Sequence, residues 1–237
     1  MVFSDSTLNQ GIVEQTRSLM RVDSTQWPVA KIVASCNNWL DYLAGYAIGA
    51  DKRFQWDDTN HSHLPEGTTS LVDGQSDYSF LTDEQGNSIV TLTGVSILNS
   101  TSGYYEPLEL VDRSDVDTST FGTIDGTPSQ YDKIADNIIR LDMLPKSTVA
   151  TGLKFYFQRT PSYFVATDTT KAPGFSPLLH RGFAIASAYD GALTLGLQNL
   201  QALSVELQKE QKKVEKYFAD RNNDSEGNIT MAQVNFM

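Results

Sequence analysis

The apolar residues of this chain follow a helical period at both ends and a strand period in the middle. Residues 1–55 and 172–222 repeat apolar side chains every three or four positions, whereas residues 64–168 hold short alternating runs between turn formers. We therefore predict an α+β protein. An N-terminal helical hairpin and long C-terminal helices form a bundle, an antiparallel β-sandwich or barrel-like unit is inserted between them, and residues 223–237 form an extended tail.

Two helices are predicted before the β-domain. The first follows Ser6 and Thr7, which can cap it, and runs to about Val22. The second has Pro28 in its first turn, where a missing N–H does no harm, and ends near Gly49. The apolar positions that define them are Leu8, Ile12, Leu19 and Met20, and then Val29, Ile32, Val33, Cys36, Trp39, Leu40, Leu43 and Ala47.

The middle of the chain predicts five to seven short strands. Alternating apolar and polar side chains are clearest at residues 89–93 and 154–157. Asp-Gly pairs at 73–74 and 125–126 are turn candidates, as is Gln-Gly at 85–86. The strand-forming runs are residues 71–80, 88–98, 105–111, 137–144 and 153–160.

The C-terminal helical region carries an apolar seam along one side. After Ser176 as a possible cap, a continuous helix to Arg221 would reach roughly 70 Å at about 1.5 Å per residue. Gly191 and Gly196 can instead mark a break, or a point where another helix comes close. The residues assigned to helix packing or a subunit seam are Leu193, Leu197, Leu200, Leu207, Val214 and Phe218.

Composition limits the classes of function. The formal charge of −11 disfavours a surface that grips nucleic acid by its phosphates. We find no signal peptide in MVFSDSTLNQ and no apolar run long enough to span a membrane. Cys36 is the single cysteine, so no intrachain disulfide can form, and its apolar helical setting favours a role in core packing.

Two groups of side chains have spacings that suggest metal ligands. His61 and His63 lie near Asp57 and Asp58, but a third histidine or a cysteine ligand is missing nearby, so a connecting loop is favoured. Part of a calcium-loop pattern runs through Asn222, Asp224, Glu226, Gly227 and Ile229. Its twelfth position is Gln233 instead of a glutamate, so an acidic hinge is favoured there.

Catalytic motifs are missing from the sequence. We find no nucleophile elbow, phosphate-binding glycine loop or dinucleotide fingerprint. The pair His180-Arg181 is interpreted as a surface or interface pair. We therefore expect a protein that is not an enzyme and that uses neither a cofactor nor a metal ion.

The order of these segments resembles the head–tail adaptor (connector, or head-completion) proteins of tailed bacteriophages, over most of the chain. In that family a G-x-P-x-x-Y turn leads into a strand that ends at proline, a partner strand follows, and a proline-containing loop re-enters the helices. The stretches that carry the resemblance are 64–80, 126–145, 153–164 and 172–192. The matching residues are Gly126, Pro128, Tyr131, Pro145, Tyr156, Pro161, Asp168, Pro173 and Pro177.

The resemblance implies a structural protein of the virion neck that is assembled in the host cytoplasm. Copies would form a ring, by resemblance a dodecamer, which binds the portal protein, extends the DNA channel and gives the tail or tail-completion proteins a docking surface. Genomic DNA would pass through without specific binding, and no membrane is involved. The tail would pair with a strand edge of the portal through Ile229, Met231, Val234, Phe236 and Met237.

Two other classes of function stay open. An extracellular or surface β-sandwich module that binds, for example, carbohydrate is compatible with the Trp and Tyr content. The long helical region and the missing signal peptide count against that class. A hydrolase is the less favoured alternative, because no assembled catalytic site is recognisable. The size and symmetry of the purified particle would separate the three classes.

Overall fold

The computed structural model describes residues 1–50, 66–83, 86–112 and 116–225. Within them the chain is mixed α+β, as predicted, and it has four α-helices and two four-stranded sheets. It divides into two compact units. The helical unit comprises Met1–Phe54 and Tyr163–Met237, and the β-unit comprises Gln55–Ser162. Residues 163–168, which we expected in the β-domain, thus belong with the helices, where Asn37 hydrogen-bonds both backbone groups of Phe164.

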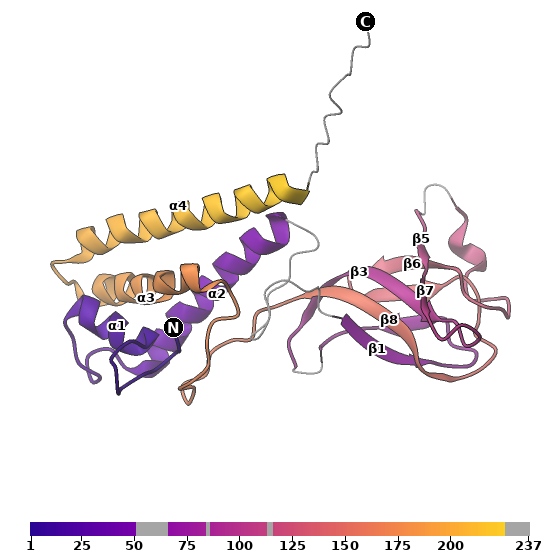
Figure 1. Ribbon diagram of the computed structural model, residues 1–237, viewed down its shortest axis with the longest axis horizontal. Coiled ribbons are helices and arrows are strands. Elements are labelled where there is room, and N and C mark those ends of the chain that lie inside the picture. The colour runs from indigo at the N-terminus through magenta and orange to yellow at the C-terminus, as the bar shows by residue number, and fades with distance from the viewer. Residues whose placement is uncertain (51–65, 84–85, 113–115, 226–237) are drawn as a thin grey trace, which may run out of the picture. The chain divides into compact units, whose positions relative to one another are not determined.

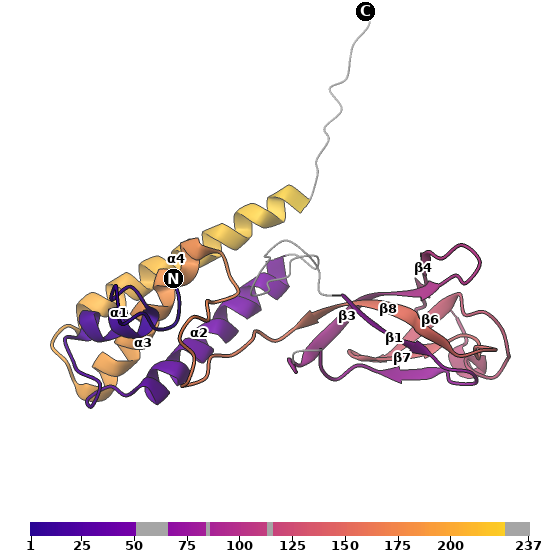
Figure 2. The same cartoon turned by 60° about the horizontal axis from the view of Figure 1, so that its bottom comes forward.

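The helical unit contains α1 (Ile12–Met20), α2 (Val29–Ala50), α3 (His180–Leu195) and α4 (Leu200–Ser225), with a short 3-10 turn, η2 (Pro177–Leu179), before α3. Helix α3 contacts each of the other three, and Figures 1 and 2 show it beside α1 and α4. Helices α1 and α2 make most of their contacts with α3 and few with each other, so the expected two-helix hairpin is wrong. The alanine-rich α3 is buried on most sides, as a central helix should be.

Helix α1 begins later than predicted. Its N-cap is Gly11, and Leu8 is 66% exposed. The Asp5 carboxylate accepts hydrogen bonds from the backbone N–H groups of Thr7 and Leu8, which holds this segment in a turn. Asn9 then adopts a left-handed backbone conformation with φ of 56°. That conformation is incompatible with a right-handed helix, so Ser6 and Thr7 precede a turn instead of capping the helix.

The C-terminal helical region is broken at Gly196. This residue ends α3 in the left-handed conformation, with φ of 65°, as C-terminal glycines commonly do. Gly191 serves the other purpose that the sequence left open. A Cβ atom there would lie 2.5 Å from Sδ of Met20 and 3.0 Å from Cε2 of Trp27. Gly196 therefore breaks the helical region, whereas Gly191 allows Met20 and Trp27 to approach α3 closely.

The β-unit contains more strands than predicted. One sheet has the order β1 (Glu66–Leu71), β8 (Val149–Arg159), β3 (Ile89–Leu98), β4 (Tyr105–Pro107); the other has the order β2 (Asp77–Ser79), β7 (Ile138–Leu141), β6 (Gln130–Ala135), β5 (Glu109–Leu110). Neither sheet closes into a barrel in the described part of the chain. The pairs are antiparallel except β5 with β6, which is parallel and corrects the all-antiparallel prediction.

The run at residues 105–111 forms two strands of different sheets. Leu108 donates its backbone N–H to the carbonyl oxygen of Val95 in β3, whereas Glu109 donates to Ser129, next to β6. Pro107 cannot donate a further ladder hydrogen bond, which suits a strand end. The crossover helps both sheets to share one apolar cluster, made of Leu71, Tyr78, Phe80, Ile89, Leu92, Val95, Ile97, Leu108, Tyr131, Ile139, Leu141, Leu153, Phe155 and Phe157.

Candidate functional site

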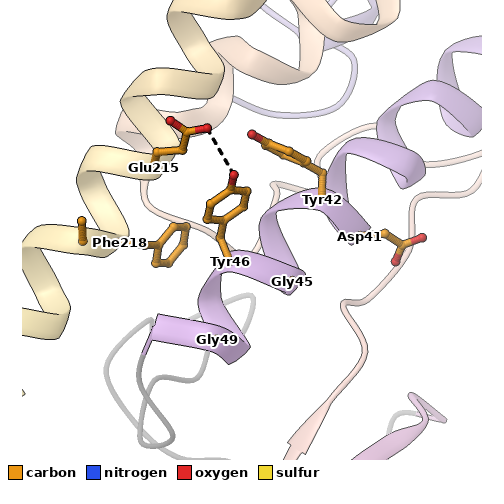
Figure 3. Close-up of a pocket in the computed structure, with 8 residues that line it drawn as sticks. Asp41, Tyr42, Gly45, Tyr46, Gly49, Glu215 and Phe218 are labelled. Atoms are coloured by element: carbon orange, nitrogen blue, oxygen red, sulfur yellow. Dashed lines mark hydrogen bonds between the residues drawn. The ribbon is translucent and has the colours of Figure 1, made fainter.

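A groove of about 600 Å³ lies between α2 and α4 of the helical unit. Figure 3 shows Tyr42 and Tyr46 of α2 turned toward Glu215 and Phe218 of α4, whereas the Asp41 side chain points away from α4. Its walls are mostly apolar or aromatic, with two carboxylates, and among the described residues no lysine or arginine lines it. The lining residues are Asp41, Tyr42, Gly45, Tyr46 and Gly49 from α2, and Glu215, Phe218 and Ala219 from α4.

Tyr42 and Tyr46 of α2 line this groove, and the buried ring of Trp39 stacks against Tyr42. Trp39, Tyr42 and Tyr46 are spaced by three and four positions, so they lie on one face of the helix. The ring centroids of Trp39 and Tyr42 are 4.8 Å apart in a stacked arrangement, and those of Tyr42 and Tyr46 are 5.0 Å apart, edge to face. Contacts of this kind restrain the rings, so the wall is a preorganised surface.

Phenol hydroxyl groups orient the two carboxylates at the groove. The Tyr46 hydroxyl donates to Oε1 of Glu215 over 3.2 Å, and the Tyr163 hydroxyl donates to Oδ1 of Asp41 over 2.6 Å. Burial, together with the hydrogen bond to Asp41, raises the pKa of Tyr163 to about 12. Burial also raises the pKa of Tyr42, and its hydrogen bond with Tyr46 adds to this. Tyr42 and Tyr163 therefore stay protonated at neutral pH.

Gly45 and Gly49 leave part of the α2 backbone uncovered. A Cβ atom at either position would meet nothing within 4 Å. Glycine inside a helix costs roughly 0.5–1 kcal/mol relative to alanine, and packing within the described chain does not require it here. The sequence prediction marked the buried stripe of this helix but missed the groove, although the Gly-x-x-x-Gly spacing with Tyr42 and Tyr46 is visible in the sequence.

The negative charge is unevenly distributed between the two units. Residues 55–162 hold 16 Asp and Glu against 6 Lys and Arg, a formal charge of −10. The rest of the chain holds 13 acidic and 12 basic residues, a formal charge of −1. Repulsion of phosphates, which the total charge predicted, is therefore a property of the β-unit and not of the helices.

The predicted apolar seam is only partly buried. Leu193 is 58% exposed, and Leu197, Leu200 and Leu207 are half-buried. Val214 and Phe218 are 1% and 2% exposed and belong to the core. The break at Gly196 separates Leu193 on α3 from the other members on α4, so the six residues do not form one continuous seam.

The structure corrects the interpretation of His180. This side chain is buried, its Nε2 lies 2.8 Å from the carbonyl oxygen of Phe175, and its Nδ1 lies 3.1 Å from the backbone nitrogen of Met1. It therefore ties the segment before α3 into the helical unit and is not a surface group. Its neighbour Arg181 is exposed and lies 3.6 Å from the carboxylate of Glu206 on α4.

The metal-ligand candidates receive no support from the described residues. There, no group of three histidine, cysteine, aspartate or glutamate side chains is placed to hold a metal ion. His61, His63, Asp57 and Asp58 lie outside the described residues. Asn222 and Asp224 lie in α4, which continues to Ser225. The first half of the calcium-like pattern is thus helical, and the favoured hinge does not begin before residue 226.

Other predicted residues differ in how far the structure describes them. Cys36 is fully buried, and burial raises the pKa of its thiol well above the usual range, as suits a core side chain. The proposed portal-binding residues Ile229, Met231, Val234, Phe236 and Met237 lie outside the described residues. Of the helices that the structure describes, none combines the length and apolarity needed to cross a membrane.

A scan against protein-family models finds no match to this chain, and a search of the curated proteins also finds none.

Proposed function

We propose that this protein is a structural subunit of a head–tail adaptor ring in the neck of a tailed bacteriophage. The observation that carries the proposal is the packing of α1 and α2, from before the β-unit, with α3 and α4, from after it. In this proposal the four helices are the bundle of the adaptor layout, and the two sheets are its inserted sandwich. The ring binds the portal, extends the DNA channel and presents a docking surface for the tail.

Three of the prolines that carry the resemblance lie just outside strands or before a helix. Pro128 is buried just before β6, and Tyr131 is buried within that strand. β7 ends at Leu141, and the buried Pro145 follows a short turn later. Pro173 is buried in the segment that enters α3. Prolines suit these boundaries because they cannot donate an N–H to a ladder or to a helix interior, and their placement supports the adaptor layout.

The uneven charge also supports a ring through which DNA passes. A β-unit of formal charge −10, repeated around a ring, repels phosphates and disfavours tight DNA binding. The near-neutral helical unit can pack against neighbouring copies without strong repulsion. Tail segments repeated around the ring would act together on the portal through their high effective concentration.

The mass of the assembled particle tests this proposal. The purified chain, alone or mixed with its portal protein, should form a closed ring, by resemblance of 12 copies, in native mass spectrometry and electron microscopy. DNA added to the ring at physiological salt should not bind tightly. A chain that stays monomeric under both conditions, and that hydrolyses a common substrate or binds a carbohydrate, would show that the adaptor assignment is wrong.

A further inference from the structure

Helix α4 carries four lysines on one exposed face. Their spacings of three, one and three positions place them within about a third of the helix circumference. The buried side chains Leu203 and Val214 lie on the opposite side of the helix. These lysines, named the lysine face below, are Lys209, Lys212, Lys213 and Lys216, and all are exposed.

Neighbouring glutamates leave this face available for a partner. Lys209 lies 2.6 Å from Glu206, and Lys213 lies 3.4 Å from Glu210, both pairs within one turn of the helix. The Lys209–Glu206 pair is exposed and therefore holds weakly, whereas Glu210 is buried and only its lysine partner is exposed. The lysine face is therefore a cationic surface that points away from the helical core.

The α2–α4 groove has the complementary chemistry. Of the lining residues that the structure describes, Asp41 and Glu215 are the charged ones, and both are carboxylates. The rings of Tyr42 and Tyr46 can attract a cation through their π faces, and the uncovered backbone at Gly45 lets a partner helix approach closely. An occupant should therefore be cationic and narrow.

Two other segments of the chain have the wrong charge for this groove. Residues 222–237 contain no lysine or arginine, and the β-unit carries a formal charge of −10. The carboxylates of Asp41 and Glu215 therefore do not attract residues 222–237, and they repel the β-unit. The lysine face of α4 has the required charge on a single helix face.

We propose that the lysine face of one copy docks in the α2–α4 groove of the next copy. The proposal rests on the ring function proposed above and names the contact that forms the ring. Of the α4 residues that line the groove, Glu215 lies roughly a third of a turn, and Ala219 roughly a fifth of a turn, from the centre of the lysine face. Each copy thus presents two different surfaces, which gives a head-to-tail interface that can close into a ring.

Charge reversal on the lysine face tests the contact. Lys212→Glu and Lys216→Glu, alone and combined, should raise the protein concentration needed for ring assembly about tenfold or more. They should leave the melting temperature of the free subunit unchanged, because both side chains are exposed. The matched control is Lys146→Glu, the same change at an exposed lysine of the β-unit, which should assemble like the wild type.

Exchange of charge across the interface gives the decisive result. A chain with Asp41→Lys and Glu215→Lys should also fail to assemble, whereas an equimolar mixture with the Lys212→Glu, Lys216→Glu chain should form alternating rings. In such a ring every lysine surface meets a carboxylate surface. If the mixture does not assemble although both chains are folded, the head-to-tail contact is wrong.

The outcomes separate this inference from the proposed function. Wild-type rings that tolerate both sets of charge reversals at the concentration of the Lys146→Glu control would overturn the proposed contact and leave the adaptor function standing. A wild-type chain that forms no ring, alone or with the portal protein, would overturn the adaptor function itself.

Discussion

The guanidinium group of Arg159 and the carboxylate of Asp83 form an ion pair inside the β-unit. Nε and Oδ2 are 3.3 Å apart, and the two side chains are 6% and 5% exposed. Asp83 also accepts hydrogen bonds from the backbone and side-chain nitrogens of Asn87, and Arg159 donates to Ser162. The pair therefore joins the loop before β3 to the last residues of the β-unit.

Loss of the acidic partner should strongly destabilise the β-unit. Asp83→Ala leaves the Arg159 charge buried without this partner, which typically costs about 3–5 kcal/mol. The matched change is Asp77→Ala, which removes the exposed pair with Arg140 and should cost less than about 1 kcal/mol. Urea unfolding followed by circular dichroism measures both values. Equal costs for the two variants would contradict the assigned difference in burial.

Two glycines on facing helices should respond oppositely to alanine. Gly182→Ala places a Cβ atom 2.9 Å from the Trp39 ring, and such overpacking costs about 1–3 kcal/mol. Gly45→Ala meets nothing within 4 Å and should stabilise α2 by about 0.5–1 kcal/mol. Thermal melting of both variants checks the signs. A stabilising Gly182→Ala would mean that α2 and α3 lie farther apart than described.

The two ends of the predicted seam should differ in tolerance. Val214→Asp buries an unpaired charge in the helical core and should cost several kcal/mol, enough to prevent folding at 37 °C. Leu193→Asp changes an exposed side chain and should shift the free energy of unfolding by less than about 0.5 kcal/mol. Soluble expression and melting temperature distinguish the two. An intact melting transition for Val214→Asp would place this residue outside the core.

Removal of residues 226–237 should separate folding from portal binding. The helices and strands that the structure describes lie before this segment, and the truncated chain should melt within a few degrees of the wild type. Binding to the purified portal protein should fall at least about tenfold if the segment adds a strand there. Surface plasmon resonance with a portal-coated chip measures this change. Unchanged portal binding would rule out the anchor role.

Lowering the pH should remove the contribution of the Arg140–Asp77 ion pair to the free energy of unfolding. The two hydrogen bonds from Arg140, of 2.8 and 3.0 Å, lower the pKa of Asp77 below its usual value. The stabilisation is therefore present above about pH 4 and is lost as the pH falls through the lowered pKa. Since the pair is exposed, wild type and Asp77→Asn should differ by at most about 1 kcal/mol near pH 6 and converge as the pH falls through the lowered pKa of Asp77. Urea unfolding across this pH range checks the trend.

Element type was predictable wherever a period repeats without interruption. The second helix was predicted to end near Gly49 and ends at Ala50, and the run at 88–98 became β3 (Ile89–Leu98). Where the start of a helix was predicted wrongly, local backbone conformation and hydrogen bonds were the reason. The hydrogen bonds to Asp5 and the left-handed conformation of Asn9 make α1 begin later than predicted. The spacing of apolar residues reveals neither effect. The partition of residues 105–111 between two sheets depends on tertiary pairing that no local pattern contains.

The groove between α2 and α4 was harder to predict because it depends on the position of two helices that are far apart in the sequence. Tyr42 and Tyr46 lie beside the predicted apolar stripe of α2, yet only the approach of Glu215 and Phe218 makes that side a groove. The exposed glycines Gly45 and Gly49 were the available signal. Glycine makes a helix less stable than alanine does, so a helical glycine that has no close neighbour in its own chain points to a close contact with another molecule.

The insertion of the β-unit between α2 and α3 also sets the order in which the protein can mature during translation. The ribosome completes the eight strands that the structure describes before it synthesises α3, the helix on which α1 and α2 pack. The β-unit can therefore fold before α3, which covers the apolar faces of α1 and α2, has been synthesised. Folding of the helical unit is the last step, and a nascent chain stalled before residue 180 should hold α1 and α2 available to chaperones.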